Sequence, residues 1–188
     1  MGSDRVRRRA VFLDRDGVLN RAVLKDGLPY PPSNANELSL LPGVTEACQR
    51  LKCAGFLLIG VTNQPDVARG RQSREAVEAI NATLLARLAL DQLRVCYHDD
   101  DDGCDCRKPQ PGLLNQAAAE FEIDLAGSFM IGDRWKDIEA GRRAGCTTIL
   151  ISSHYLERKA NDFDCEVSSL TDAAEWILKR NTGEDKTK

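Results

Sequence analysis

The stretch Phe12-Leu-Asp14-Arg-Asp16-Gly-Val-Leu-Asn20 decides the fold, because in it a short apolar run ends directly on two aspartates. The run has the composition of a buried strand, and Gly17 permits a sharp turn after it. Both carboxylates can then face one site, where their mutual repulsion favours a bound cation or a raised pKa on one of them. A surface turn rich in Asp and Gly explains these residues alone equally well.

Short apolar runs alternate with helical patterns along the rest of the chain. The predicted strands cover residues 10–13, 56–61, 93–97, 128–131 and 147–151, and the predicted helices cover residues 44–53, 73–88, 111–121 and 135–144. Five strands joined by helices predict an α/β fold, a doubly wound and mostly parallel sheet covered on both faces. We expect one domain over residues 10–180, a basic segment 1–9 before it and a disordered tail 181–188 after it.

The composition restricts the class of protein. A chain of 188 residues, 42% hydrophobic and 29% charged, is typical of a globular protein with one core. The net charge of -3 argues against a partner that is a nucleic acid. No apolar run is long enough to cross a membrane or to act as a signal sequence. We therefore expect a cytoplasmic monomer that acts on a small molecule.

Polar residues follow the predicted strands, at the edge of the sheet where ligands of such folds bind. Asp14 follows the first strand and Asp133 the fourth, and together they would make an oxygen-rich site suited to Mg²⁺. Thr62 offers a hydroxyl and Lys108 a positive charge to phosphate oxygens. Taken singly, Lys108 is more typical of a solvated surface lysine, and Thr62 is typical of a residue at the end of any strand.

Taken together, these residues resemble the four motifs of the haloacid dehalogenase (HAD) superfamily of phosphotransferases. The matching positions, in order, are Asp14-Arg-Asp16-Gly, Thr62, Lys108, and Gly132-Asp133 with Asp137. The resemblance covers roughly residues 10–151. It implies that Asp137 orients the lysine or a metal-bound water.

The resemblance implies a magnesium-dependent phosphatase with a covalent intermediate. Asp14 would be the nucleophile, and Asp16 would first donate and later accept a proton. Mg²⁺ would be held by Asp14, the backbone carbonyl of Asp16, and Asp133. Thr62 and Lys108 would stabilise the charge on the transferring phosphoryl group.

The segment Cys96-Tyr-His98-Asp-Asp-Asp-Asp-Gly-Cys104-Asp-Cys106 supplies three thiolates and one imidazole, the ligands of a closed structural Zn²⁺ site. Three reduced cysteines beside a lone histidine are the alternative. The acidic run 99–102 is expected to be a solvated loop tip, because thiolates suit zinc better than carboxylates. The other cysteines are expected to be small buried hydrophobes: Cys48, Cys53, Cys146 and Cys165.

This segment followed by Arg107-Lys108-Pro109 resembles a group of small zinc-containing HAD phosphatases without a large cap, which includes heptose bisphosphate and histidinol phosphatases. Val67-Ala-Arg-Gly70 and Lys108-Pro-Gln-Pro-Gly112 resemble the heptose enzymes, which implies removal of the 7-phosphate from D-glycero-D-manno-heptose 1,7-bisphosphate, in lipopolysaccharide or nucleotide-sugar biosynthesis. Pro65-Asp66 and the short spacing from His98 to Cys104 depart from that pattern, so histidinol phosphate stays the alternative substrate.

Substrate contacts are expected from five residues: Asn63, Gln64, Arg69, Arg107 and Arg134. The arginines would bind the distal phosphate, although Arg69 and Arg134 also read as exposed surface residues. Tyr30-Pro-Pro32 is expected to form an extended loop near the mouth of the site. Two alternatives come from other classes: a receiver-like switch, disfavoured by Asp16 and the zinc segment, and a catalytically silent binding module, disfavoured because every catalytic position is filled.

Overall fold

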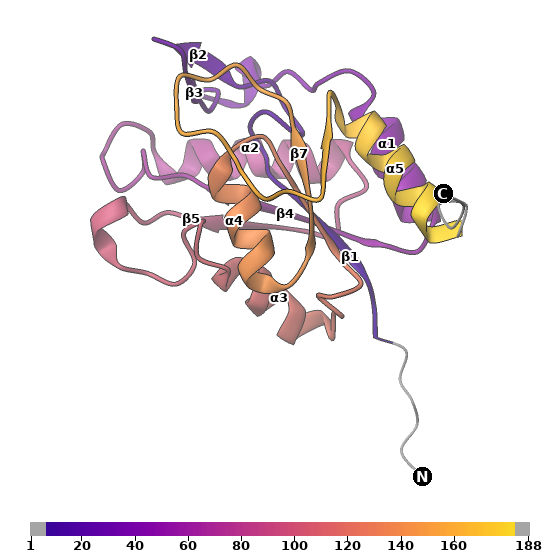
Figure 1. Cartoon of the computed structure of the whole chain (residues 1–188). Coiled ribbons are helices and arrows are strands. Elements are labelled where there is room, and N and C mark those ends of the chain that lie inside the picture. The colour runs from indigo at the N-terminus through magenta and orange to yellow at the C-terminus, as the bar shows by residue number, and fades with distance from the viewer. Residues whose placement is uncertain (1–6, 183–188) are drawn as a thin grey trace.

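Six parallel strands form the central sheet in the computed structural model of the chain, which describes residues 7–182 (Figure 1). Across the sheet they are β5 (Gln92–Cys96), β4 (Leu57–Asn63), β1 (Ala10–Leu13), β6 (Phe129–Gly132), β7 (Thr147–Ile151) and β8 (Cys165–Val167). Every pair of neighbouring strands is parallel. The expected α/β class is therefore confirmed.

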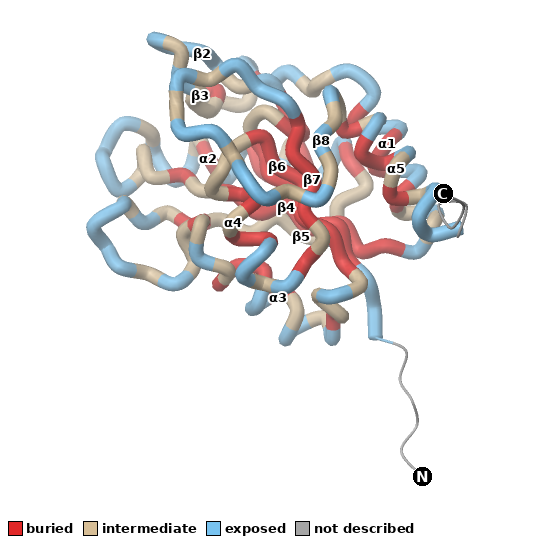
Figure 2. Tube along the Cα trace, viewed as in Figure 1, coloured by how far each residue is buried: buried red, intermediate tan, exposed pale blue. Residues whose placement is uncertain are grey.

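Helices cover both faces of this sheet. In the described residues they are α1 (Val44–Cys53), α2 (Arg74–Arg87), α3 (Gly112–Phe121), α4 (Trp135–Ala144) and α5 (Leu170–Thr182), with two short 3-10 turns, η1 (Ala35–Glu37) and η2 (Asp100–Asp102). Successive residues of β1 point to opposite faces: Val11 and Leu13 pack in the core with α1, α2 and α5, whereas Ala10 and Phe12 pack in the core with α3. Figure 2 shows the buried strands between the helical layers.

The order of the strands reverses between β1 and β6, and this places the site. From β1 the chain proceeds through β4 to β5 on one side of the sheet, and from β6 through β7 to β8 on the other. Asp14 follows β1 directly, and its backbone N–H donates to Ile131 O of β6 at 3.0 Å. Asp133 follows β6 directly. Such a switch point leaves a crevice beyond the strand ends, where ligands of open α/β sheets bind.

Several elements lie beyond the five strands and four helices that the sequence predicts. Strand β8 and helix α5 complete one edge of the molecule, and an antiparallel hairpin of β2 (Val23–Lys25) and β3 (Leu28–Tyr30) lies beside the loop that follows β7 (Figure 1). Leu156 of that loop donates its backbone N–H to Gly27 O at the tip of the hairpin, at 2.9 Å. These three-residue strands carry too short a pattern to stand out in a sequence.

Two smaller expectations need correction. Cys53, expected to be buried, is exposed because it ends α1 on the solvent side, and Cys165 is partly exposed, while Cys48 and Cys146 are buried as expected. Helix α5 continues to Thr182, two residues into the expected tail. The remainder of that tail and residues 1–6 lie outside the described residues. None of the helices in the described part is long and apolar enough to span a membrane.

Candidate active site

Three buried aspartates meet at the carboxyl ends of β1 and β6. One carboxylate oxygen each of Asp14, Asp133 and Asp137 lies within 4.8 Å of the other two. Glycines make this approach possible. Gly17 has a φ of 96°, and a Cβ there would lie 1.8 Å from Asp133 Oδ2. A Cβ on Gly132 would lie 2.1 Å from Asp137 Cβ, so neither position accepts a side chain without displacing an aspartate.

Burial disfavours the ionised form of these carboxyl groups. It raises the pKa of Asp14 from 3.8 to about 6, against the lowering effect of Lys108. Burial also raises the pKa of Asp133 well above its usual value, and the negative charges of Asp14 and Asp137 raise it further. A bound cation would remove this cost, because it favours the charged form of each carboxyl group.

Lys108 lies between two of the aspartates. Its Nζ is 2.6 Å from Asp14 Oδ1 and 2.6 Å from Asp137 Oδ1, and it donates to Val61 O at 2.8 Å. The lysine is only 2% exposed, so its reading as a solvated surface residue is wrong. Burial opposes the charge, but Asp137 and Asp14 outweigh this effect and raise the pKa of Lys108. The contact agrees with the expectation that Asp137 orients the lysine.

Asn63 and Gln64 connect the neighbouring motifs. The side chain of Asn63 donates to Lys108 O at 2.9 Å and accepts from Lys108 N at 3.0 Å. Gln64 Nε2 donates to Asp16 Oδ2 at 2.9 Å and to Thr62 Oγ1 at 2.8 Å. Both residues were expected to bind substrate, and in the structure their amides hold the candidate catalytic side chains in position.

A cleft of about 230 Å³ opens onto this group. The expected site residues along its wall are Asp14, Asp16, Thr62, Asn63, Gln64, Arg69, Arg107, Lys108, Arg134 and Asp137. Asp133 lies deeper, at 3% exposure. The hairpin contributes Leu28, Pro29 and Tyr30, followed by Pro31, so the Tyr30 segment, expected near the site, lines the cleft, and its first residue ends strand β3.

The cations farther along the cleft are paired with acidic side chains. Arg134 forms an ion pair with Glu157, with Nε 2.8 Å from Oε1. Arg69 Nε donates to Asp99 Oδ2 at 2.8 Å, and Arg107 pairs with Asp100. The acidic run is therefore more than a solvated tip, because its first two carboxylates bind arginines of the cleft.

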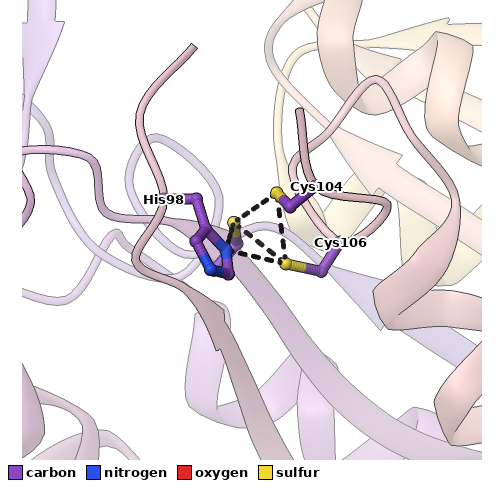
Figure 3. A group of neighbouring side chains, drawn as sticks. His98, Cys104 and Cys106 are labelled. Atoms are coloured by element: carbon purple, nitrogen blue, oxygen red, sulfur yellow. Dashed lines mark hydrogen bonds between the residues drawn. The ribbon is translucent and has the colours of Figure 1, made fainter. Parts of the chain in front are cut away.

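Cys96, His98, Cys104 and Cys106 form a second cluster, and Figure 3 shows His98, Cys104 and Cys106 pointing toward one another. The sulfur to sulfur distances are 3.7 Å for Cys96 and Cys104, 3.2 Å for Cys96 and Cys106, and 3.5 Å for Cys104 and Cys106. His98 Nδ1 lies 3.5 Å from the Cys96 sulfur and 3.3 Å from the Cys106 sulfur. Tetrahedral zinc with Zn–S bonds of about 2.3 Å separates its sulfur ligands by about 3.8 Å. The four residues thus fit a Zn²⁺ ion.

Comparison with known proteins decides the family. Residues 105–166 match the family described as HAD-hydrolase-like. The D-glycero-beta-D-manno-heptose-1,7-bisphosphate 7-phosphatase of Pseudomonas aeruginosa is 36% identical over 151 residues, which cover 78% of this chain and 82% of that protein. The enzyme of the same name from Yersinia pestis is 35% identical over 181 residues, 90% of this chain and 89% of its own. The chain belongs to the HAD-like hydrolases.

Solved structures agree with this membership. The D,D-heptose 1,7-bisphosphate phosphatase of B. bronchiseptica, crystallised with magnesium and phosphate, superposes with a TM-score of 0.74 at 30% identity over 92% of this chain and 99% of that one. A HAD-like phosphatase of Mesorhizobium loti gives a TM-score of 0.75 at 28% identity over 93% of this chain and 88% of its own. The protein is thus a HAD phosphatase, as the four motifs indicate.

The aspartate group of this HAD phosphatase fits a magnesium ion. Asp133 Oδ2 accepts a hydrogen bond from Tyr155 OH at 2.6 Å, whereas Asp133 Oδ1 is buried and has no hydrogen-bond partner among the described residues. An unpartnered buried oxygen beside a second carboxylate, that of Asp14, is a donor set that Mg²⁺ prefers. Ser153 Oγ donates to Asp133 O at 2.9 Å. Two residues of the loop after β7, Ser153 and Tyr155, therefore form hydrogen bonds with this aspartate.

Several site residues of the HAD phosphatase escaped the sequence reasoning. Arg15 is wholly buried and pairs with the Asp16 carboxylate at 2.9 Å, while Asn20 Nδ2 donates to Asp16 Oδ1 at 2.9 Å. Tyr155 and Lys136 also reach the site. Arg15 and Asn20 stand in the motif quoted first, and Lys136 stands between Asp133 and Asp137 of the fourth motif, so all three could have been noticed. The role of Tyr155 depends on packing between separate segments and leaves no signal in the local sequence.

Proposed function

We propose that this HAD phosphatase removes the 7-phosphate of D-glycero-D-manno-heptose 1,7-bisphosphate through a phosphorylated Asp14. The observation that carries the proposal is a single cleft with Asp14 and Lys108 at one end and a separate group of cations, Arg69, Arg107 and Lys136, lining it as well. A substrate with two phosphates would place one at Asp14 and Lys108 and the other at this group of cations. The relatives described above bear the name of this activity, which supports the choice of substrate.

In the first step an oxygen of Asp14 attacks phosphorus, and the bond from phosphorus to the sugar oxygen breaks. Lys108, fixed by Asp14 and Asp137 at 2.6 Å each, neutralises charge on the phosphoryl oxygens, and Thr62 donates its hydroxyl to them. Asp16 gives its proton to the departing sugar oxygen, which leaves as an alcohol. The products are the heptose 1-phosphate and an aspartyl phosphate.

In the second step water attacks the phosphorus of the aspartyl phosphate. Asp16, now ionised, takes the proton of this water, and the bond from phosphorus to Asp14 breaks, which releases inorganic phosphate and restores both carboxyl groups. Asn20, Gln64 and Arg15 hold the Asp16 carboxylate in place for both transfers. Mg²⁺, held by Asp14, Asp133 and the carbonyl of Asp16, would supply charge neutralisation between nucleophile and phosphate.

Zinc would have a structural role in this proposal. Three cysteines and a histidine fill a tetrahedral shell, which leaves no position for substrate. Arg107, one residue after the last cysteine, donates from NH1 to His98 O at 3.2 Å. A metal that fixes His98 therefore also fixes the guanidinium of Arg107 in the cleft. That the enzyme works as a monomer remains a prediction, as does the division into one domain over residues 10–180.

The test is a comparison of kcat/KM for D-glycero-D-manno-heptose 1,7-bisphosphate and for histidinol phosphate, with identification of the heptose product by ³¹P NMR. The proposal predicts a preference of about a hundredfold or more for the heptose, roughly 2.7 kcal/mol of transition-state binding, with the 1-phosphate retained. The reverse preference would assign the enzyme to histidinol phosphate. Slow and equal rates would show that neither compound is its substrate.

A further inference from the structure

Three cations of the cleft converge on one carboxylate, that of Asp100. Arg69 NH2 lies 3.1 Å from its Oδ2, Arg107 NH2 lies 2.9 Å from its Oδ1, and Lys136 Nζ lies 3.3 Å from the same Oδ1. The three come from separate parts of the chain, the loop after β4, the end of the cysteine segment and helix α4. All four residues line the cleft.

This group brings together the hydrogen-bond donors of an anion-binding site. Lys108, at the buried end of the cleft, is already balanced by Asp14 and Asp137. At the Asp100 end all three cations contact the Asp100 carboxylate, and Arg69 also pairs with Asp99 and, at 3.8 Å, with Asp66. Among the described residues, Asp100 is the one carboxylate that Arg107 and Lys136 share there. A phosphate dianion carries more charge than a carboxylate and more oxygens to accept hydrogen bonds, and arginine forks match its geometry. A phosphate therefore competes for the same donors.

The side chain of Asp100 can move away from the three cations at small cost. It is 57% exposed, so its carboxylate can return to water. It lies in the three-residue turn η2, whose backbone is held by reciprocal hydrogen bonds of Asp99 and Asp102 and not by the Asp100 side chain. Gly103 follows with a φ of 61°, and a Cβ there would meet no atom of the described residues within 4 Å, so the chain beside the turn is not tightly packed. The carboxylate can thus swing out while the turn and the zinc ligands stay in place.

We propose that the Asp100 carboxylate occupies the subsite for the second phosphate of the substrate and is displaced when a bisphosphate binds. This inference rests on the proposed function, because it assigns a specificity role within the same cleft. In the free enzyme Asp100 occupies the point where the three side chains converge and offsets part of their positive charge. A weakly held anion such as free phosphate must then compete with it, whereas a bisphosphate anchored at Asp14 displaces it intramolecularly.

The experiment compares Asp100→Asn with the matched control Asp101→Asn. Both changes remove one negative charge from η2, but the exposed Asp101 contacts none of the three cations within the described part of the chain. The readout is the kcat/KM for heptose 1,7-bisphosphate divided by that for heptose 7-phosphate. For Asp100→Asn this ratio is expected to rise about five- to tenfold, the effect of removing competing, partly exposed ion pairs. For Asp101→Asn it should stay within about twofold of the wild type.

The other outcomes contradict the proposal. A ratio that falls or stays constant in Asp100→Asn would mean that the carboxylate positions the arginines. An equal rise in both variants would mean a general charge effect. If the wild type hydrolyses histidinol phosphate and Asp100→Asn abolishes this, Asp100 binds the cation of that substrate instead.

Failure of the proposed function is distinguishable from these outcomes. If the wild type leaves heptose bisphosphate intact, the substrate assignment is wrong, and the Asp100 inference is decided by a second pair of compounds. Fructose 1,6-bisphosphate and fructose 6-phosphate then serve as inhibitors of p-nitrophenyl phosphate hydrolysis. The ratio of their inhibition constants must shift in favour of the bisphosphate in Asp100→Asn alone.

Discussion

The two ends of the cleft hold their charges in different ways. At the aspartate end, Asp14, Lys108 and Asp137 are 7%, 2% and 2% exposed, and each charge is fixed by another buried charge. At the other end, the side chains of Arg107, Lys136, Arg69 and Asp100 are 11%, 22%, 30% and 57% exposed. Buried charges interact strongly and are costly to separate, whereas exposed pairs contribute about 0.2–1 kcal/mol. The charges around the proposed nucleophile are thus fixed in the core, whereas the cations proposed to bind the second phosphate lie nearer the surface, where single substitutions should change them at small cost.

The largest difference between the ends is expected for their lysines. In Lys108→Met, kcat should fall about 10³-fold, because the charge that meets the transferring phosphoryl group is lost. The free energy of unfolding in chelator should also fall by about 3 kcal/mol, since Asp14 and Asp137 are left buried without their cation. Lys136→Met is the matched change at the exposed end, and it should raise KM for the bisphosphate with little loss of kcat. Steady-state kinetics and chemical denaturation measure both, and similar losses of kcat in the two variants would refute the comparison.

A smaller effect is expected at the tyrosine behind the metal ligands. Tyr155→Phe removes the hydrogen bond at 2.6 Å that fixes Asp133 Oδ2, so the orientation of Oδ1 is no longer held. The affinity for Mg²⁺ should fall about 10- to 100-fold, as for other residues that orient a metal ligand. Isothermal titration with Mg²⁺ measures this directly, without reliance on activity, and saturating Mg²⁺ should restore most of kcat. An unchanged affinity would mean that the phenol only packs against Gly17.

Loss of zinc should weaken substrate binding at the end of the cleft that contains Arg107 and Asp100. Cys104→Ser removes one ligand, and we expect the zinc content to fall below one ion per chain and KM for the bisphosphate to rise about tenfold, because Arg107 depends on His98 for its position. Metal analysis and kinetics test both statements. Cys53→Ser, an exposed cysteine outside the cluster, serves as the control and should change neither quantity. A normal KM in zinc-depleted enzyme would show that the zinc segment does not position Arg107 for substrate binding.

The smallest effect concerns pH and the buried end. Because the pKa of Asp14 is raised from 3.8 to about 6, its protonated form stabilises the fold below about pH 4, and this contribution is lost as the pH rises through about 6. Mg²⁺ replaces the proton, so the increase in Tm that it produces should be larger at about pH 7.5 than at about pH 5. Thermal unfolding with Mg²⁺ and with chelator measures the difference. An equal increase at both pH values would show that proton and metal do not compete.

The buried end was largely predictable from sequence, and the exposed end was not. Asp14 and Asp133 each follow a short apolar run directly, so the rule that ligands bind beyond the carboxyl ends of parallel strands is enough to bring them together. Lys108 could be placed only by its resemblance to a motif. Its burial results from contacts with segments far away in the chain.

Residues that act through packing gave no such signal. Tyr155 lies in an irregular loop after β7, and its role depends on the contact between that loop and Asp133, which follows β6. Asp100 lies in a run of four aspartates, where no local pattern distinguishes the one that meets three cations. Strand β8 and the hairpin of β2 and β3 are too short for a periodic pattern.

The central claim is that phosphate passes through Asp14, and chemical trapping of the intermediate tests it most directly. The enzyme is mixed with substrate and Mg²⁺, quenched in acid during turnover, reduced with borohydride and digested for peptide mass spectrometry. Reduction converts an aspartyl phosphate to homoserine, so the account predicts homoserine at position 14 and none in Asp14→Asn or without substrate. Homoserine at another aspartate, or an unmodified Asp14 under conditions of full turnover, would contradict it.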